Sequence, residues 1–147
     1  HTIFKNLLKQ LDYPLAAPSA NITTKVSAVK VKDVKEEFGN KIKYIFFPHW
    51  SWMVPKEITD NYDCVCIHMT DLPYGRGGSP LQNLIIKGHK TTKLTALKMT
   101  QELDTGDVYH KVSLGLLGSA QEIFIDGANK IYELIKFIIE NNYPKFN

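Results

Sequence analysis

The sequence predicts an α/β domain, because short apolar strands alternate with amphipathic helices along its 147 residues. Pro and Gly residues separate these segments, as is typical of turns between strands and helices. Apolar residues make up 44% of the chain and charged residues 22%, the composition of a globular protein. The length fits one domain by size, and no repeat or low-complexity tract interrupts the pattern.

The first third of the chain predicts a helix, a loop and a second helix. Ile3–Leu11 has apolar residues four positions apart and ends before Pro14. Leu15–Asn21 is rich in small residues and fits a strand or a loop. Val31–Phe38 resumes helical spacing, and Gly39 is a typical C-terminal cap.

Two buried strands are expected next. Lys43–Phe47 is a short apolar strand that ends at Pro48, and Pro55–Thr59 fits one helical turn. Asp63–His68 is the second strand, and the Pro- and Gly-rich segment Asp71–Gly78 follows it as a loop.

A helix and two strands follow that loop. Ser79 is expected to cap the helix and Pro80 to occupy its first position. Leu94–Met99 and Val108–Leu114 alternate in polarity and predict strands. The buried face of the helix is expected to consist of Leu81, Leu84, Ile85 and Gly88.

A long helix closes the chain. Ser119 and Glu122 form a capping-box pattern at its start, and Pro144 is expected to end it. The expected apolar stripe is Phe124, Ala128, Ile131, Ile135 and Ile138.

Composition limits the classes of partner and compartment. The formal charge is +3, from 18 Lys and Arg against 15 Asp and Glu, and Arg76 is the single arginine. This excess is scattered along the chain, so it does not indicate the basic stripe of a nucleic-acid-binding surface. It fits a small anionic ligand about as well as no charged ligand at all. Two cysteines, Cys64 and Cys66, cannot build a disulfide framework, and they indicate a reducing cytoplasmic compartment.

No targeting or membrane segment is expected. The longest apolar stretches, near residues 44–54 and 134–139, are shorter than the roughly 20 residues that a bilayer requires. No signal peptide is visible. The chain begins with His1 rather than Met, which favours a fragment or a missing true start.

His68 and Asp104 are the candidate catalytic pair. His68 ends a predicted strand before a loop, where open α/β sheets place their ligands. Asp104 follows one helix and one strand later and is positioned to return to the imidazole, and a His oriented by a carboxylate suits proton transfer. The alternative is structural: a buried histidine, and a turn residue before Gly106.

The segment from about Tyr44 to Val112 resembles the N-terminal catalytic domain of the folate-dependent formyltransferases. That family includes methionyl-tRNA formyltransferase, glycinamide ribonucleotide transformylase and sugar-nucleotide N-formyltransferases. The matching residues, in the family's order, are His68, Thr70, Leu72-Pro73, Arg76-Gly77, Pro80, Gly88, Thr95 and Asp104-Thr-Gly106.

The resemblance implies a Rossmann-like fold and formyl transfer from 10-formyltetrahydrofolate to an amine. The acceptor would be methionyl-tRNA or an amino-sugar nucleotide, with no DNA and no metal. His68 would move protons and Asp104 would hold it. The pterin would lie against an aromatic segment whose residues are Phe47, Trp50, Trp52 and Met53. Cys64 and Cys66 offer too few neighbouring ligands for a metal site, and Arg76 fits either a loop anchor or an anion contact.

One position departs from the family pattern. The family has an Asn two residues before the His, as a hydrogen-bond donor to the developing oxyanion, and this chain has Cys66. A thiol is a weak donor, and losing one such donor lowers the rate by about 10²–10³. The resemblance therefore implies a slow enzyme, or one in which Thr70 or a backbone N–H substitutes.

Residues 1–43 resemble a late segment of the threonylcarbamoyl-adenylate synthases, through Pro14-Leu-Ala-Ala-Pro-Ser-Ala-Asn21 and the helix around residues 33–39. The predicted organisation is thus a synthase-like fragment, 1–43, and a formyltransferase-like domain, 44–147, that lacks the first strands of its sheet. Residues 1–43 are not expected to replace those strands. The alternatives are an ATP-binding synthase fragment that acts in tRNA modification, and a non-catalytic remnant.

Overall fold

The computed structural model describes residues 42–50 and 52–142. Three expectations lie outside the described residues: the elements between Ile3 and Phe38, the packing of residues 1–41 and the end of the last helix at Pro144. Residues 42 and 43 are described and precede the first strand. The described elements are β1 (Tyr44–Pro48), α3 (Lys56–Thr59), β2 (Asp63–His68), α4 (Pro80–Ile86), β3 (Thr91–Lys98), β4 (Val108–Gly115) and α5 (Ala120–Glu140).

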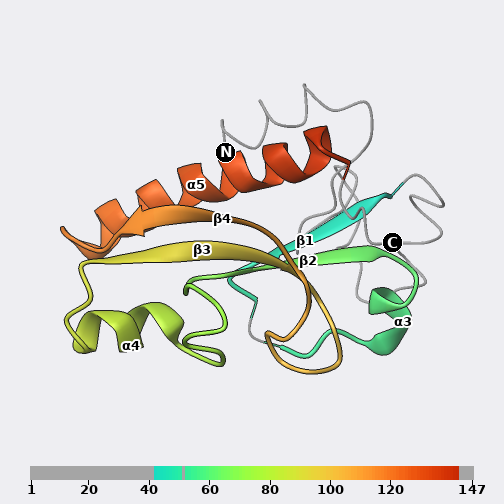
Figure 1. Ribbon diagram of the computed structural model, residues 1–147, viewed down its shortest axis with the longest axis horizontal. Coiled ribbons are helices and arrows are strands. Elements are labelled where there is room, and N and C mark those ends of the chain that lie inside the picture. The colour runs from blue at the N-terminus through green and yellow to red at the C-terminus, as the bar shows by residue number, and fades with distance from the viewer. Residues whose placement is uncertain (1–41, 51, 143–147) are drawn as a thin grey trace, which may run out of the picture.

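These elements form a mixed α/β fold around a four-stranded sheet of order β1-β2-β3-β4, so the predicted fold class is confirmed. Helix α5 runs alongside β4, while α4 lies on the other side of β3 in the view of Figure 1. The expected strand Asp63–His68 is confirmed residue for residue. Strand β3 begins at Thr91 rather than at the expected Leu94, because its polar first residues pair with the end of β4.

Strand directions determine where the loops meet. β1 and β2 are parallel, whereas β2, β3 and β4 pair antiparallel in succession. His68, at the end of β2, lies opposite Thr95 of β3. The last residue of β3, Lys98, lies opposite Val65, so the β3–β4 connection starts beside the middle of β2 and must fold back to reach His68.

Helix α5 covers the sheet with a different stripe from the expected one. Its start is as predicted: the Ser119 hydroxyl accepts from the Glu122 N–H and the Glu122 carboxylate accepts from the Ser119 N–H. The expected burial of Phe124 and Ala128 is wrong, because both are exposed. In the first two turns, Ile123 and Gly127 face the sheet, one position before the expected Phe124 and Ala128. The buried residues of α5 are Ile123, Gly127, Ile131, Leu134, Ile135 and Ile138.

Helix α4 also departs from expectation at its start and on its face. Pro80 occupies the first helical position as predicted, but the Ser79 side chain makes no capping hydrogen bond. Ser79 instead has a φ of 50°, in the left-handed region. Leu81 and Leu84 are buried, whereas Ile85 is 45% exposed, because this two-turn helix covers the core with only one narrow edge. Within the described residues, no helix has both the length and the apolar character needed to cross a membrane.

Candidate active site

A cavity of about 340 Å³ lies beside the carboxyl end of β2. Its walls come from the segment after β1, from the end of β2, from the start of α4, from the β3–β4 connection and from one side chain of α5. His68, Asp104 and Cys66 all line it. Segments distant in sequence therefore converge on one concavity, whose volume is in the range of small-molecule sites.

His68 and Asp104 form a buried pair, with side chains only 8% and 7% exposed. The His68 Nδ1 lies 3.6 Å from the Asp104 Oδ2, within ion-pair distance but too long for a hydrogen bond. The His68 Nε2 lies 2.8 Å from the carbonyl oxygen of Gly75. Because a carbonyl can only accept, Nε2 carries a proton and Nδ1 is the nitrogen that can take up another. The pair can thus hold an imidazolium against a carboxylate.

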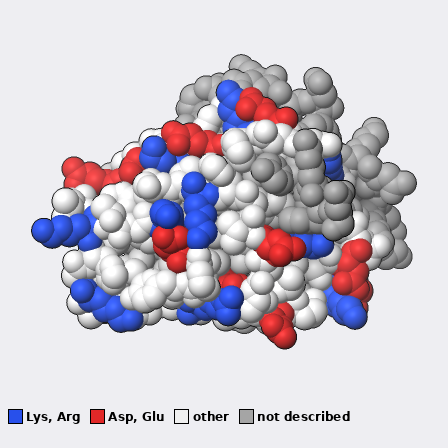
Figure 2. Space-filling model, viewed as in Figure 1, with Lys and Arg blue, Asp and Glu red and all other residues white. Residues whose placement is uncertain are grey.

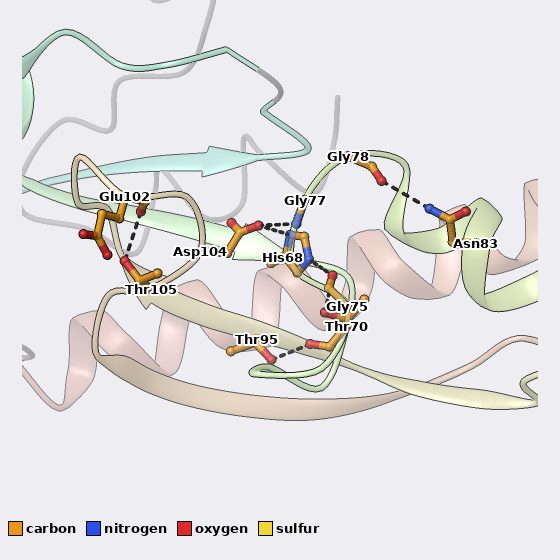
Figure 3. A network of polar contacts seen from close by, with 10 residues as sticks. All are labelled: His68, Thr70, Gly75, Gly77, Gly78, Asn83, Thr95, Glu102, Asp104 and Thr105. Carbon is orange, nitrogen blue, oxygen red and sulfur yellow. Dashed lines mark hydrogen bonds and ion pairs between the residues drawn. The ribbon is translucent and has the colours of Figure 1, made fainter.

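The carboxylate of Asp104 is itself fixed. The backbone N–H of Gly77 donates to Asp104 Oδ2 at 2.9 Å, so that Gly77 and His68 meet at one oxygen atom (Figure 3). Asp104 has a φ of 54°. Three of the four non-glycine residues with positive φ in the described part of the chain, His49, Ser79 and Asp104, line the cavity. Backbone strain of this kind gathers where side chains must be held for function.

The loop after β2 is tied to the sheet by two threonines. The Thr95 hydroxyl donates to the Thr70 carbonyl oxygen at 2.6 Å, and the Thr70 hydroxyl donates to the Gly75 carbonyl oxygen at 3.2 Å (Figure 3). The Gly75 carbonyl oxygen thus accepts hydrogen bonds from both Thr70 and His68. Both threonines are fully buried. Their role here is to hold the carbonyl that fixes the orientation of His68.

The remaining motif residues have different positions. Leu72 is buried and packs with Cys66 and Leu97 beneath the cavity. Pro73 and Arg76 are exposed and are not among the cavity-lining residues, while Pro80 is one of them. Arg76 is therefore not part of the cavity wall.

Cys66 lies on β2 two residues before His68, so both side chains point to the same face of the strand. It is 9% exposed. Burial, together with the nearby charge of Asp104, raises the pKa of the Cys66 thiol to about 12. The side chain is therefore a neutral S–H group at physiological pH, available only as a weak donor.

The aromatic segment after β1 divides into a wall and its support. Trp50, Trp52 and Met53 line the cavity. Phe47, which we expected to contact the pterin, is instead buried with Val54 and Cys64, and its ring lies edge-on to Trp50 at 5.6 Å. Phe47 still belongs to β1, and its side chain packs with Val54 and Cys64 in the small core behind the wall.

One aromatic residue at the cavity, Phe124, was missed by sequence reasoning. Phe124 and His49 both line the cavity, and their rings meet edge-on at 5.7 Å. His49 belongs to the aromatic segment after β1, which was expected to form the pocket wall or core, whereas no local motif marked Phe124, because it comes from the distant helix α5. The sequence signal that could have identified Phe124 is the alternative apolar face of α5 that begins at Ile123, because with Ile123 facing the sheet Phe124 faces away from it. Among the described residues, no group of three or more His, Cys, Asp or Glu side chains is placed to hold a metal ion.

Comparison with known proteins points to formyltransferases over most of the chain. Methionyl-tRNA formyltransferase from Clostridioides difficile is 32% identical over 130 residues, which are 80% of this chain and 41% of that protein. The solved structure of methionyl-tRNA formyltransferase from Clostridium thermocellum matches with a TM-score of 0.74 and 39% identity, over 97% of this chain and 61% of that one. HypX from Aquifex aeolicus in complex with tetrahydrofolic acid shares the fold, with a TM-score of 0.66 at 24% identity, over 78% of this chain and 20% of that one.

Two further findings describe the extent of these matches. The chain spans between 23% and 41% of the length of the curated relatives it matches. A family described as "Telomere recombination", with the members Sua5, YciO and YrdC, matches residues 1–57. The chain is therefore similar to methionyl-tRNA formyltransferases in sequence and in its Rossmann-like fold, and its first 57 residues are similar to the Sua5, YciO and YrdC family.

Proposed function

We propose that this protein transfers a formyl group from 10-formyltetrahydrofolate to an amine. The observation that carries the proposal is the buried His68–Asp104 pair at the wall of the cavity, oriented by Gly75 and Gly77. Formyl transfer needs a group that removes a proton from the attacking amine and a site that accommodates charge on the formyl oxygen. The pair meets the first need.

The proton path follows from the hydrogen bonds. Because Nε2 of His68 is committed to the Gly75 carbonyl, Nδ1 is where a proton from the amine would enter. The carboxylate of Asp104, 3.6 Å away, would then stabilise the imidazolium. The proton would pass on to N10 of the folate as the bond between N10 and the formyl carbon breaks, which releases tetrahydrofolate and restores the neutral imidazole. Proton transfer by a positioned side chain contributes about 10²–10⁴ to a rate. Cys66 and backbone N–H groups are the available donors toward the formyl oxygen.

The cavity is compatible with a reduced folate. Its volume of about 340 Å³ suits a fused bicyclic ring, and Trp50, Trp52 and Met53 offer flat or flexible apolar contacts. The donor supplies the activated formyl carbon, and the chain supplies the wall and the proton acceptor. HypX, which shares this fold, is solved in complex with tetrahydrofolic acid, and this supports a reduced folate as the ligand to test first.

The acceptor is an amine on a tRNA or on a small molecule. We propose methionyl-tRNA as the first to test, because it appears in the names of curated relatives that this chain matches. On the face shown in Figure 2, acidic and basic side chains are interspersed rather than gathered in one basic stripe. The two cysteines of the described chain are free and buried, which fits the reducing compartment of the cytoplasm.

The test is the rate of formyl transfer from 10-formyltetrahydrofolate to methionyl-tRNA and to amino-sugar nucleotides. We expect His68→Ala to lower the rate at least 100-fold on the scale of general-base loss, with folate binding retained. His110→Ala is the matched control, because His110 stacks on Phe137 of α5 and does not line the cavity. A chain that binds no folate analogue, or a His68→Ala variant as active as the control, would refute the proposal.

A second candidate function rests on the family match to residues 1–57. We propose as the alternative that residues 1–43 are a fragment of a threonylcarbamoyl-adenylate synthase that binds ATP, joined to the formyltransferase-like residues 44–147. Stabilisation of the chain against heat by ATP, with no stabilisation by a folate analogue, would favour it. Stabilisation by neither ligand, with no turnover, would favour a non-catalytic remnant.

A further inference from the structure

Lys111 makes two contacts with the loop that orients His68. It lies on β4 opposite Thr95 of β3, with its side chain 27% exposed. Its ammonium group donates to Asp71 Oδ1 at 2.6 Å and also to the carbonyl oxygen of Leu72. One cation on the fourth strand therefore fixes two consecutive residues at the start of the loop after β2.

The same loop carries the two groups that hold the His68–Asp104 pair. The Gly75 carbonyl oxygen accepts from His68, three residues beyond Leu72, and the Gly77 N–H donates to Asp104 two residues later. At its far end the loop is fixed by Asn83 of α4, whose side chain donates to the Gly78 carbonyl oxygen at 3.3 Å (Figure 3). A displacement of Leu72 would therefore shift both the Gly75 carbonyl oxygen, which contacts His68, and the Gly77 N–H, which contacts Asp104.

We infer that Lys111 is a positioning residue for His68, acting through Asp71, Leu72 and the Gly75 carbonyl. Lys111 does not line the cavity, so it does not contact the reacting groups. Its effect is to fix which imidazole nitrogen carries the proton. Without the Leu72 contact, the Thr70 hydroxyl alone holds the Gly75 carbonyl, so the carbonyl gains freedom to move. His68 can then exchange its Nε2–H form for the Nδ1–H form.

Lys93 provides a matched comparison. Its ammonium lies 3.0 Å from the other oxygen of Asp71, and its side chain is 43% exposed. The structure gives it no hydrogen bond to a loop carbonyl. Hydrogen bonds from Lys111 and then from Lys93 lower the pKa of Asp71, so both cations act on the carboxylate. Only Lys111 adds the backbone contact, and Lys93→Met should therefore leave the loop in place.

The first experiment does not depend on activity. In the full chain labelled with ¹⁵N, the two imidazole nitrogens of His68 are observed by NMR in the wild type, in Lys111→Met, in Lys111→Arg and in Lys93→Met. We expect widely separated shifts in the wild type and Lys93→Met, as for a fixed Nε2–H form. In Lys111→Met the two shifts should converge, and Lys111→Arg, which keeps a cationic donor, should restore much of their separation. Unchanged shifts in a folded Lys111→Met variant would overturn the inference.

Should Lys111→Met fail to fold, Lys111→Thr decides the question, because threonine suits a half-exposed strand position and is too short to reach Leu72. Convergence of the two His68 shifts in Lys111→Thr, with none in Lys93→Met, supports the inference. Wild-type shifts in a folded Lys111→Thr variant overturn it.

The second experiment rests on the proposed formyl transfer. We expect kcat to fall on the order of 10- to 100-fold in Lys111→Met, while KM for the folate stays within about twofold, because small misplacements of a catalytic group act on the chemical step. An equal loss in Lys93→Met would overturn the inference. If the wild type transfers no formyl group, the proposed function fails, and the NMR result still decides the role of Lys111.

Discussion

Replacement of Cys66 by Asn tests the chemistry of the cavity most directly. The two positions 66 and 68 lie on one face of β2, roughly 6.6 Å apart along the strand. An amide at position 66 would place an N–H donor beside the imidazole, where negative charge develops on the formyl oxygen. The thiol now present has a pKa of about 12 and stays protonated, so the change exchanges a weak neutral donor for a strong neutral donor.

The size of the effect follows from two opposing contributions. A preorganised oxyanion donor is worth about 10²–10³ in rate, or roughly 3–4 kcal/mol. Against this, position 66 packs with Leu72 and Leu97 and is only 9% exposed, so an amide without partners would lose about 1–3 kcal/mol of folding stability. We expect formyl transfer to rise about 10- to 100-fold, and the free energy of unfolding to fall by about 1–2 kcal/mol.

The assay compares the initial rates of formyl transfer at saturating folate for the wild type, Cys66→Asn and Cys66→Leu. Leucine has the branching and the number of side-chain heavy atoms of asparagine and no donor, so it serves as the control for repacking without hydrogen bonding. Cys66→Asn should be faster than both other proteins. A brisk wild type that Cys66→Asn slows would show that another group, such as a backbone N–H, already serves the oxyanion, since the Thr70 hydroxyl is committed to the Gly75 carbonyl.

Three further predictions concern stability and reactivity. Gly106→Ala should destabilise the fold by about 3 kcal/mol or more in a denaturant titration, because a Cβ there would lie 1.8 Å from the backbone oxygen of Lys98; a loss below 1 kcal/mol would contradict the close approach. Ser119→Ala should cost about 1 kcal/mol, by removing the cap of α5, and an unchanged melting temperature would exclude that role. Burial raises the pKa of both the Cys64 and Cys66 thiols to about 12, so at pH 8 roughly one thiol in ten thousand is a thiolate in the folded chain. Both cysteines should therefore be alkylated only on unfolding, and rapid labelling of the folded chain would contradict their burial.

Local patterns were enough to predict the sheet and the candidate pair. The strand Asp63–His68 is apolar between two turn-forming segments, and its end fixes the position of His68 without any knowledge of the tertiary structure. Asp104 was identified because its spacing from His68 matches a family pattern, and the structure places the two side chains 3.6 Å apart. The bounds of a strand depend on neighbouring residues, and the spacing of His68 and Asp104 depends on the order of motifs along the chain, so both can be read from the sequence.

The contacts that orient the pair could not be predicted in the same way. Lys111 reaches Asp71 only because β4 lies beside β3, and its sequence neighbourhood is that of an ordinary exposed strand residue. The position of Phe124 depended on the phase of α5 against the sheet, where a shift of one residue rotates a side chain by about 100°. Phe47 was placed in the cavity by the family resemblance and the aromatic content of its segment, whereas its side chain packs with Val54 and Cys64 in the core.

The separation of His68 and Asp104 in the chain has a kinetic consequence. Asp104 lies on the connection of the β3–β4 hairpin, a local unit that can form early, whereas His68 joins it only when β2 pairs with β3. During refolding, hairpin signals should therefore precede the imidazole–carboxylate contact. The cavity needs both pairings, because its walls include the end of β2 and the β3–β4 connection, so it should form after the hairpin.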